Sequence, residues 1–567
     1  MAIQFDDERS KKELEDLRKS EEEDLVVALS ESKYGIPSIN LATISIENDA
    51  LRTMEEKDAI EEGAAPFKVV GHELQVAVRS PQPDTLERLK KYFTDRGYVP
   101  HFYMASLKSL QKAWERYKEM SFASESRAGS IDISSQVLEE ITKKIKNLED
   151  VKKLVEETEK GKVHTTSHIL EVVIGGAIAI DASDIHFEPE EHTVRLRFRL
   201  DGVLQEVTNI SPEIHRFLNS RIKLLAGVKI SSHSTAQDGR FSIYLGNDEI
   251  SLRVSLIPGA YGESIVLRIL NPKSIRVKLE DMGIEPKLYE IFMREIAKPN
   301  GLILLTGPTG SGKTTTLYSF LQKIYSTELK IITIEDPIEY HLAGITQTQT
   351  DDEKGYTFLE GLRSVLRQDP DVIMVGEIRD GETAKIAIES ALTGHMVFST
   401  LHTNNAAGVI PRLIDLGVNP KILVSALSLS IAQRLVRKLC KVCMKEIETG
   451  DKEKKVITVI WENAKTHNKN LIDYGATDIA NGIKLYGPVG CEACNNTGYK
   501  GRMGIFEAIL NDAAIEAIIP NNPSEREIKE IAANQGILDM KEDGVVKILT
   551  GITSFDEVQS VVDFYEV

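Results

Sequence analysis

The stretch LILLTGPTGSGKTTTLYSFLQKI, residues 302–324, decides the fold of this chain. Its centre, GPTGSGKT at 307–314, fits the pattern G-x-x-x-x-G-K-[ST] in every position. An apolar strand pattern precedes it and a helical run follows it, as a phosphate-binding loop requires. Glycines let backbone N–H groups turn toward phosphates, and the helix adds its positive end. The stretch therefore predicts a nucleotide site, and the alternative of a chance glycine-rich turn does not explain this context.

Each residue type in the loop has a chemical role. Lys313 is predicted to reach the β- and γ-phosphates of ATP, and the Thr314 hydroxyl to ligate Mg²⁺. The predicted nucleotide-binding residues are Gly307, Pro308, Thr309, Gly310, Ser311, Gly312, Lys313, Thr314 and Thr315.

Two acidic segments follow the loop. ITIEDPIE places Glu335 and Asp336 at the end of a predicted strand over 331–334, and DVIMVGEIRD places Glu377 after a predicted strand over 372–375. Ligands of open α/β sheets bind at the carboxyl ends of the strands. A single acid after a strand is usually an ordinary strand-end residue. Two of them downstream of a phosphate loop favour a catalytic role.

Two histidines flank a further apolar run in TGHMVFSTLHTNNA, His395 before it and His402 after it. They are possible metal ligands, but the segment offers no third ligand. A strand-end histidine with a purely structural role is the other alternative. We favour a γ-phosphate sensor or a coupling role at this segment, with His402 in the catalytic set.

The chain has only four cysteines, and they form two C-x-x-C pairs. Paired C-x-x-C segments suit a tetrahedral Zn²⁺ site, and buried free thiols are the alternative. Four thiolates leave no open coordination position, so the sequence predicts a structural zinc and not a catalytic one. The predicted ligands are Cys440, Cys443, Cys491 and Cys494.

Composition and charge limit the class of protein. The chain has 567 residues, 41% hydrophobic and 28% charged, which indicates several soluble domains. The net charge of −18 makes nucleic acid an unlikely direct partner, because phosphate contacts need cations. The sequence offers no apolar run long enough to span a membrane and no secretory signal at its start. We therefore expect a cytoplasmic protein that docks on membranes through partners.

Pattern changes along the chain predict four regions. Residues 1–120 are expected to form a small α/β domain, with strands at 67–70 and 74–78 and a helix at 84–98. Residues 121–165 are expected to be a partly helical linker, serine-rich at first and highly charged later. Residues 166–275 predict an α+β middle domain. Residues 276–567 alternate strand and helix, which predicts a parallel sheet with crossover helices, followed by a helical tail from about 510.

These motifs, in this order, resemble the type II secretion and type IV pilus ATPase family. Segments that strengthen the resemblance include ASDIHFEP, QDGRFSI, IAQRLVRKLC and GCEACNNTGYKGRMGIFE, and it covers about residues 165–567. The first 120 residues are similar to the family's N-terminal domain only in outline. The resemblance implies an α/β multidomain fold with a RecA-like phosphate-loop core, a PAS-like middle domain and a zinc-binding insert at 438–502.

The resemblance also implies roles. Glu377 would act as the general base, Glu335 would polarise the water or the Mg²⁺ shell, and Arg253 and Arg268 would reach the γ-phosphate across domains or subunits. The protein would be a homohexameric motor acting on an inner-membrane platform protein. The tetracysteine insert favours assembly or export over retraction.

We expect pilus assembly ahead of type II secretion, with DNA uptake or conjugation as a less favoured reading. One departure from the family pattern is the turn with Ser232, His233 and Ser234, where relatives carry basic and acidic residues. Its role is therefore open. The family's arginine–leucine–glycine motif for a cyclic dinucleotide was not found, so that ligand is not predicted.

Overall fold

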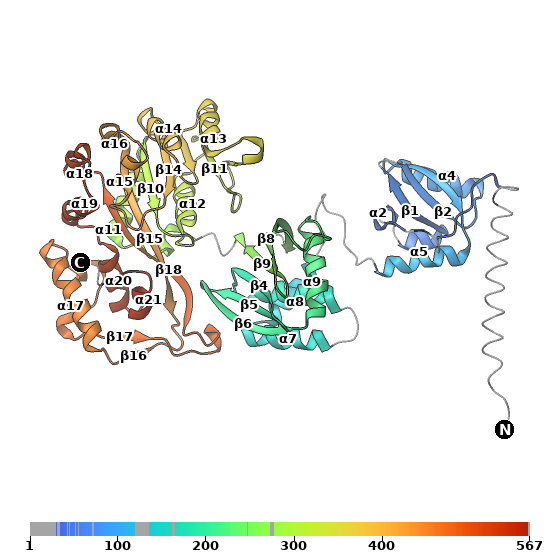
Figure 1. Ribbon diagram of the computed structural model, residues 1–567, viewed down its shortest axis with the longest axis horizontal. Coiled ribbons are helices and arrows are strands. Elements are labelled where there is room, and N and C mark those ends of the chain that lie inside the picture. The colour runs from blue at the N-terminus through green and yellow to red at the C-terminus, as the bar shows by residue number, and fades with distance from the viewer. Residues whose placement is uncertain are drawn as a thin grey trace, which may run out of the picture. The chain divides into compact units, whose positions relative to one another are not determined.

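A computed structural model gives the fold of the chain. It divides the chain into two compact units, residues 1–126 and 127–567 (Figure 1). The residues that the structure describes are 30, 34–41, 44, 46–51, 53–54, 56–70, 73–119, 135–160, 165–246, 248–272 and 277–564.

The first unit has its own hydrophobic core around a three-stranded sheet of order β1-β2-β3. β1 and β2 pair antiparallel, whereas β2 and β3 pair parallel and are connected through α4, as a parallel pair requires. The two strands expected here are confirmed, and so is a helix, although the one expected over 84–98 ends at Thr94, before the turn at Gly97 (φ 85°). The elements are α2 (Asn48–Leu51), α3 (Glu56–Glu61), β1 (Ala64–Val70), β2 (Glu73–Val78), α4 (Pro83–Thr94), β3 (Val99–Met104) and α5 (Leu107–Glu119).

The second unit begins with a middle region built on a six-stranded antiparallel sheet of order β6-β5-β4-β9-β8-β7. Side chains of β5 alternate between buried and half-buried, so one face of the sheet is committed to the core. The elements are β4 (Asp184–Pro189), β5 (Val194–Leu200), β6 (Val203–Ile210), α9 (Pro212–Leu225), β7 (Gln237–Leu245), β8 (Asp248–Gly259) and β9 (Gly262–Leu270).

Three helices cover this sheet: α6 (Ser135–Lys144), α7 (Leu148–Lys160) and α8 (Thr165–Ala179). Two glycines of α8 let its neighbours approach, because a Cβ on Gly175 would lie 2.8 Å from Ile141 and one on Gly176 would lie 2.9 Å from Val151. Helices α6 and α7 share one hydrophobic core with the sheet. The expected linker thus contributes two packed helices to the middle region. Its serine-rich part, 121–134, lies outside the described residues.

A seven-stranded sheet of order β12-β11-β13-β14-β10-β15-β18 organises the rest of the second unit. All its pairs are parallel except β15 with β18. Every residue of β10, β13 and β14 is buried, which explains their continuous apolar runs. The strands are β10 (Gly301–Thr306), β11 (Ile331–Glu335), β12 (Thr346–Gln349), β13 (Val372–Val375), β14 (Met396–Leu401), β15 (Leu427–Leu439) and β18 (Tyr499–Leu510).

Helices lie on both faces of this sheet (Figure 1). Leu302 and Leu304 belong to one hydrophobic core, and Ile303 and Leu305 belong to another, so successive residues of β10 serve opposite layers. The expected strands and crossover helices are confirmed. The helices are α11 (Pro286–Ile296), α12 (Lys313–Ile324), α13 (Phe358–Val365), α14 (Gly381–Leu392), α15 (Val409–Asp415) and α16 (Pro420–Ala426).

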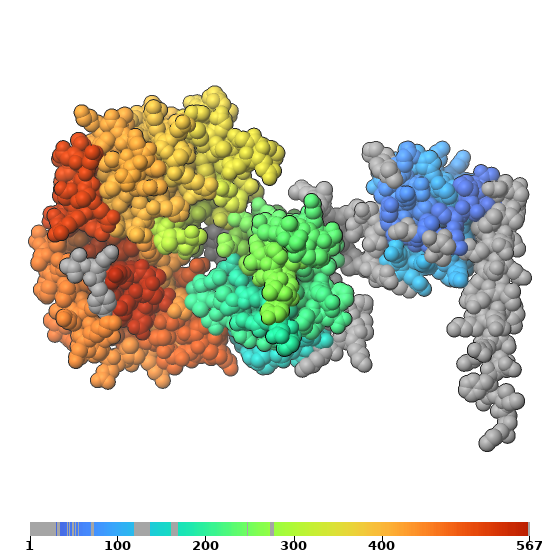
Figure 2. Space-filling view, viewed as in Figure 1, coloured from blue at the N-terminus to red at the C-terminus, as the bar shows by residue number. Residues whose placement is uncertain are grey.

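An insert separates β15 from β18, and a helical tail follows β18. A buried ion pair of 2.8 Å between Lys469 and Glu542 joins the insert to the tail, and Figure 2 shows the two segments side by side at the surface. Across the described ranges, no helix has the length and apolarity to cross a bilayer. The elements are β16 (Lys445–Ile447), α17 (Asp451–Thr466), β17 (Leu485–Gly487), α18 (Ala513–Ile518), α19 (Glu525–Ala532), α20 (Met540–Leu549) and α21 (Phe555–Gln559).

Candidate active site and metal cluster

The glycine-rich loop connects β10, an interior strand of the seven-stranded sheet, to helix α12. Gly307 and Gly312 have φ of 146° and 91°, in the region that favours glycine. There is also no room for a side chain, because a Cβ would lie 2.6 Å from the Gln433 carbonyl oxygen at Gly307 and 2.8 Å from the Gln433 amide at Gly312. Pro308, Thr309, Gly310 and Thr314 are exposed, whereas Ser311 is buried and Thr315 is half-buried. The loop is therefore open to a ligand at the start of a three-turn helix.

The lysine of the loop is held against the loop backbone. Lys313 Nζ donates to the carbonyl oxygens of Gly307 and Pro308, at 2.9 and 3.1 Å. Burial lowers the pKa of Lys313, nearby Glu377 opposes this shift, and Arg434 adds to it. A partly desolvated ammonium beside a helix N-terminus attracts an anion more strongly than a fully hydrated one does.

Glu377 lies at the carboxyl edge of the sheet and contacts one residue that follows the neighbouring strand β14 and one from its own segment. His402, which follows β14, has its Nε2 2.9 Å from Glu377 Oε2, and Arg379 forms an ion pair with the other carboxylate oxygen. Arg379 also pairs with Asp336 at 3.2 Å. Burial opposes ionisation of Glu377, but the hydrogen bonds from His402 and Arg379 outweigh it and hold the pKa of Glu377 below its ordinary value.

The sequence prediction missed Arg379. Its signal was present in GEIRD, where a cation follows the acid by two residues. The parallel register that pairs Val375 with Ser399 explains why Glu377 and His402 meet, since both follow neighbouring strands at the same edge.

Glu335 is placed differently from Glu377. Its side chain is buried, and its carboxylate accepts hydrogen bonds from the Tyr318 hydroxyl, from Thr333 Oγ1 at 2.5 Å and from Gln347 Nε2 at 3.0 Å. Tyr318 belongs to α12, the helix that begins at the loop. The carboxylate thus accepts three hydrogen bonds from the protein, and its expected role in polarising water or the Mg²⁺ shell stays a prediction.

The two histidines of the third segment are separated. His395 precedes β14 and its Nδ1 lies 2.9 Å from the Ser390 carbonyl oxygen, whereas His402 follows the other end of the same strand. Histidines at opposite ends of a six-residue strand do not share one metal ion. Of the pair, only His402 lies with the acids.

The predicted arginines lie in one row across the middle sheet. Strand register pairs Arg240 with Arg253, Arg253 with Arg268, and Arg268 with Asp184. Arg268 Nε donates to Asp184 at 2.9 Å, while Arg253 pairs with Glu339 at 3.1 Å, in the segment after β11. Burial lowers the pKa of Arg253. Asp184 and Glu339 pair with two of the three arginines, so the row keeps an excess of positive charge, which suits an anion.

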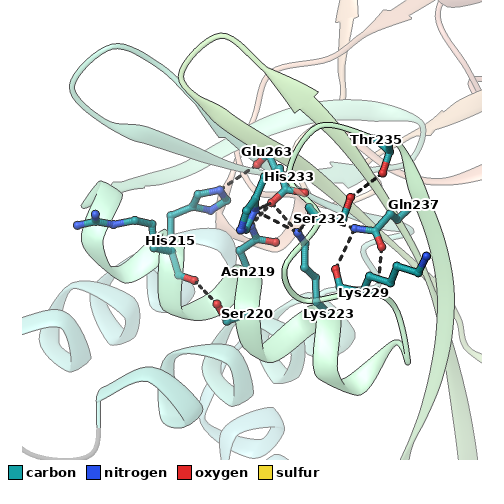
Figure 3. Close-up of polar contacts among 11 residues, drawn as sticks. His215, Asn219, Ser220, Lys223, Lys229, Ser232, His233, Thr235, Gln237 and Glu263 are labelled. Atoms are coloured by element: carbon teal, nitrogen blue, oxygen red, sulfur yellow. Dashed lines mark hydrogen bonds and ion pairs between the residues drawn. The ribbon is translucent and has the colours of Figure 1, made fainter.

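The unusual turn before β7 is fixed by a buried ion pair (Figure 3). Lys223 is fully buried and donates to Glu263 Oε2 at 2.7 Å and to the Ser232 carbonyl oxygen at 2.6 Å. His233 Nδ1 lies 2.6 Å from the same Glu263 oxygen. Gln237 then holds Lys229 through two hydrogen bonds. The turn therefore positions the start of β7, the strand that carries Arg240, although its own residues depart from the family pattern.

The four cysteines form one cluster, with their ligand atoms all within 4.8 Å of one another. The Sγ–Sγ distances are 3.9 Å for Cys440–Cys491, 3.8 Å for Cys443–Cys494 and 3.7 Å for Cys491–Cys494. Zn–S bonds of about 2.3 Å in a tetrahedron place sulfurs about 3.8 Å apart. These distances fit zinc and are far too long for disulfides. Within the described residues, this is the one group of three or more His, Cys, Asp or Glu side chains with such spacing.

Comparisons with known proteins identify the family of the chain. A family model described as type II/IV secretion system protein matches residues 158–560, more than half of the chain. The chain belongs to the type II/IV secretion system protein family. A second model, the MshEN domain, matches residues 34–124 of this secretion-family protein. The resemblance noted from the motifs is confirmed.

Two relatives and one solved structure illustrate the match. The type IV pilus assembly ATPase PilB of Myxococcus xanthus is 36% identical over 540 residues, which cover 95% of this chain and 91% of PilB. The type II secretion system protein E of Dickeya dadantii is 43% identical over 393 residues, covering 69% and 75%. The Legionella pneumophila ATPase DotB is similar in fold, with a TM-score of 0.50 at 22% identity, covering 71% of this chain and 97% of DotB. This secretion-family protein is an ATPase with an α/β multidomain layout.

Proposed function

We propose that this secretion-family ATPase drives type IV pilus assembly. The observation that carries the proposal is the match to PilB of Myxococcus xanthus, which spans nearly the whole of both chains. The type II secretion relative is more similar residue by residue, at 43% identity, but it covers only 69% of this chain. Type II secretion is therefore the second candidate, and DNA uptake or conjugation ranks below it because of the net charge of −18.

We propose a RecA-like phosphate-loop core at residues 276–567, which includes the zinc insert at 438–502 and the helical tail. A PAS-like middle domain precedes it. The interior position of β10 and the helices on both faces of its sheet support the first assignment. The proposed protein acts as a homohexamer at the inner face of the cytoplasmic membrane, where it engages an inner-membrane platform protein.

The proposed chemistry begins with phosphate binding. The backbone N–H groups of the loop and the start of α12 hold the phosphates of ATP, and Lys313 reaches the β- and γ-phosphates. Mg²⁺, held by the Thr314 hydroxyl, would neutralise charge on the phosphates. Glu377 takes the proton of the attacking water, and its low pKa keeps it ionised at neutral pH.

The surrounding residues orient these groups. His402 and Arg379 hold the two oxygens of the Glu377 carboxylate, so neither oxygen rotates freely. Glu335 ties α12 to β11 and thereby sets the loop against the acids. Arg253 and Arg268 would offset charge that develops on the γ-phosphate.

The cysteine cluster is proposed to hold a structural zinc through Cys440, Cys443, Cys491 and Cys494. The N–H groups of Gly490 and Gly498 lie 3.4 and 3.3 Å from Cys443 and Cys494 Sγ, where they would stabilise thiolates. Four thiolate ligands complete the coordination of zinc, so the metal would stabilise the insert without entering the reaction.

Deletion of the gene in the bacterium that carries it tests the proposal. Surface pili should be lost and should return with the wild-type gene but not with Lys313→Ala. A strain that keeps its pili but stops exporting proteins would refute pilus assembly and support type II secretion. Unchanged pili and unchanged export, with loss of DNA transfer, would support the third reading.

A further inference from the structure

The turn that carries His402 is anchored on two sides. On the loop side, the Thr403 N–H donates to Thr306 Oγ1 at 2.7 Å, and Thr306 immediately precedes the phosphate loop. On the same side, His402 contacts Glu377. These two contacts connect the turn to the proposed nucleotide site.

The other side of the turn is anchored to the C-terminal part of the chain. The backbone N–H of Ala406 donates to Glu507 Oε1 at 2.6 Å, and Glu507 lies on β18. The second oxygen of Glu507 accepts the N–H of Met540, the first residue of α20, at 3.4 Å. One carboxylate therefore bridges the histidine turn and a tail helix about 130 residues further along the chain.

A second contact runs parallel to the first. Asn405 Nδ2 donates to Glu525 Oε1 at 2.5 Å, and Glu525 is the first residue of α19. Asn405 Oδ1 accepts the N–H of Gly408 at 2.9 Å, which fixes the shape of the turn. Asn405 thus bonds directly to α19, and the next residue, Ala406, is linked to α20 through Glu507.

Placing the Glu507 carboxylate between the turn and α20 costs free energy, because the site is poorly hydrated. Burial raises its pKa, and the N–H groups of Ala406 and Met540 oppose that shift. A carboxylate kept in a poorly hydrated place is retained where its hydrogen bonds order their partners. The bonded partners here are the histidine turn and the start of α20.

We propose that Glu507 is a positioning residue for ATP hydrolysis, which holds the 402–406 turn so that His402 faces Glu377 and which links the tail helices to the active site. Glu525 supports the same turn through Asn405. The inference rests on the proposed roles of His402 and Glu377. A movement of α19 or α20, for example on binding a neighbouring copy or a partner, would reach the catalytic acid through these two contacts.

Steady-state kinetics on the full chain test the proposal. Glu507→Ala removes both acceptors and should lower kcat about ten- to a hundredfold, the range expected for hydrogen bonds to a charged group. KM for ATP should change less than about twofold, because the loop itself is untouched. Glu507→Gln keeps one acceptor for Ala406 and should restore most of the rate. Glu525→Ala, at the surface, should lower kcat by a smaller factor.

A double mutant separates positioning from general loosening. In a His402→Ala background, Glu507→Ala should lower kcat by no more than about twofold further, since both changes remove the same contact. Glu557→Ala is the matched control, because Glu557 also accepts a backbone N–H, from Arg437 at 3.0 Å, and ties α21 to β15 away from the turn. In the double mutant with His402→Ala, the two factors by which the single changes lower kcat should multiply.

Two outcomes would overturn the inference. One is that Glu507→Ala lowers kcat by the same factor in the His402→Ala background as in the wild type, as is expected of the control Glu557→Ala. The other is a wild-type kcat in both Glu507→Ala and Glu525→Ala while His402→Ala is impaired. A wild-type kcat in His402→Ala would instead refute the proposed role of His402, which distinguishes the two failures. If Glu507→Ala does not fold, Glu525→Ala is measured in the wild type and in the His402→Ala background instead. An equal fold-change in kcat in both backgrounds would then overturn the inference.

Discussion

Replacing Glu377 by glutamine removes one charge from the proposed base and keeps the shape of the side chain. A positioned general base contributes about 10²- to 10⁴-fold to a rate, or about 2.7–5.5 kcal/mol of activation free energy at about 1.36 kcal/mol per decade. The amide can accept from His402 or from Arg379 but not from both as the carboxylate does. Arg379 keeps Asp336 as a partner, so the structural loss is small. We therefore expect kcat to fall by about 10²- to 10⁴-fold.

The assay measures phosphate release together with binding of a fluorescent ATP analogue. Binding should change less than about fivefold, or about 1 kcal/mol, because the loop is intact. Glu389→Gln on α14 is the matched control, since it makes the same charge change at an exposed site. A Glu377→Gln rate within twofold of wild type would refute the reasoning about this acid. Loss of binding along with the rate would refute the claim that the substitution acts on chemistry alone.

Three further predictions concern Arg379, the cysteine cluster and Tyr318. Arg379→Ala removes a donor that lowers the pKa of Glu377. Burial, which raises that pKa, is then opposed by His402 without Arg379, so the acid limb of kcat should move to higher pH, as measured by a pH–rate profile from neutral pH downward. Cys443→Ser should release zinc, measured by metal analysis, and make the insert sensitive to proteolysis while residues outside it stay protected. Tyr318→Phe leaves an oxygen of Glu335 without its buried donor and should destabilise the core by about 1–3 kcal/mol, read as a lower unfolding midpoint in denaturant.

The sequence predicted the elements that depend on local pattern. The buried parallel strands and the glycine-rich turn between β10 and α12 each have a signature a few residues long, because a buried strand and a tight turn impose strict local geometry. Each C-x-x-C pair is local as well, although the two pairs of the cysteine cluster lie about 50 residues apart. The distribution of apolar residues also predicted a helix that the structure gives as Pro83–Thr94, and the tail helices.

Other features depended on contacts between distant segments. The helices of 135–160 were read as linker because their exposed faces are charged, and only α8, with its two glycines, shows what their apolar faces contact. The position of Glu335 at a strand end is visible in the sequence, whereas its hydrogen bonds depend on Tyr318 and Gln347, which come from other elements. The bridge made by Glu507 joins three segments far apart in sequence, which no spacing reveals.

Strand β15 connects two parts of the chain that differ in their sensitivity to oxidation. Gln433, near its middle, lies against the phosphate loop, and Cys440 follows its last residue. The strand thus connects an oxidisable group to the loop proposed to bind phosphates. Oxidation of Cys440 would remove one of the four sulfurs of the cluster, while the end of the strand stays paired with β18 through Leu439. In an oxidising cell, we therefore expect the insert to lose its order before the loop does.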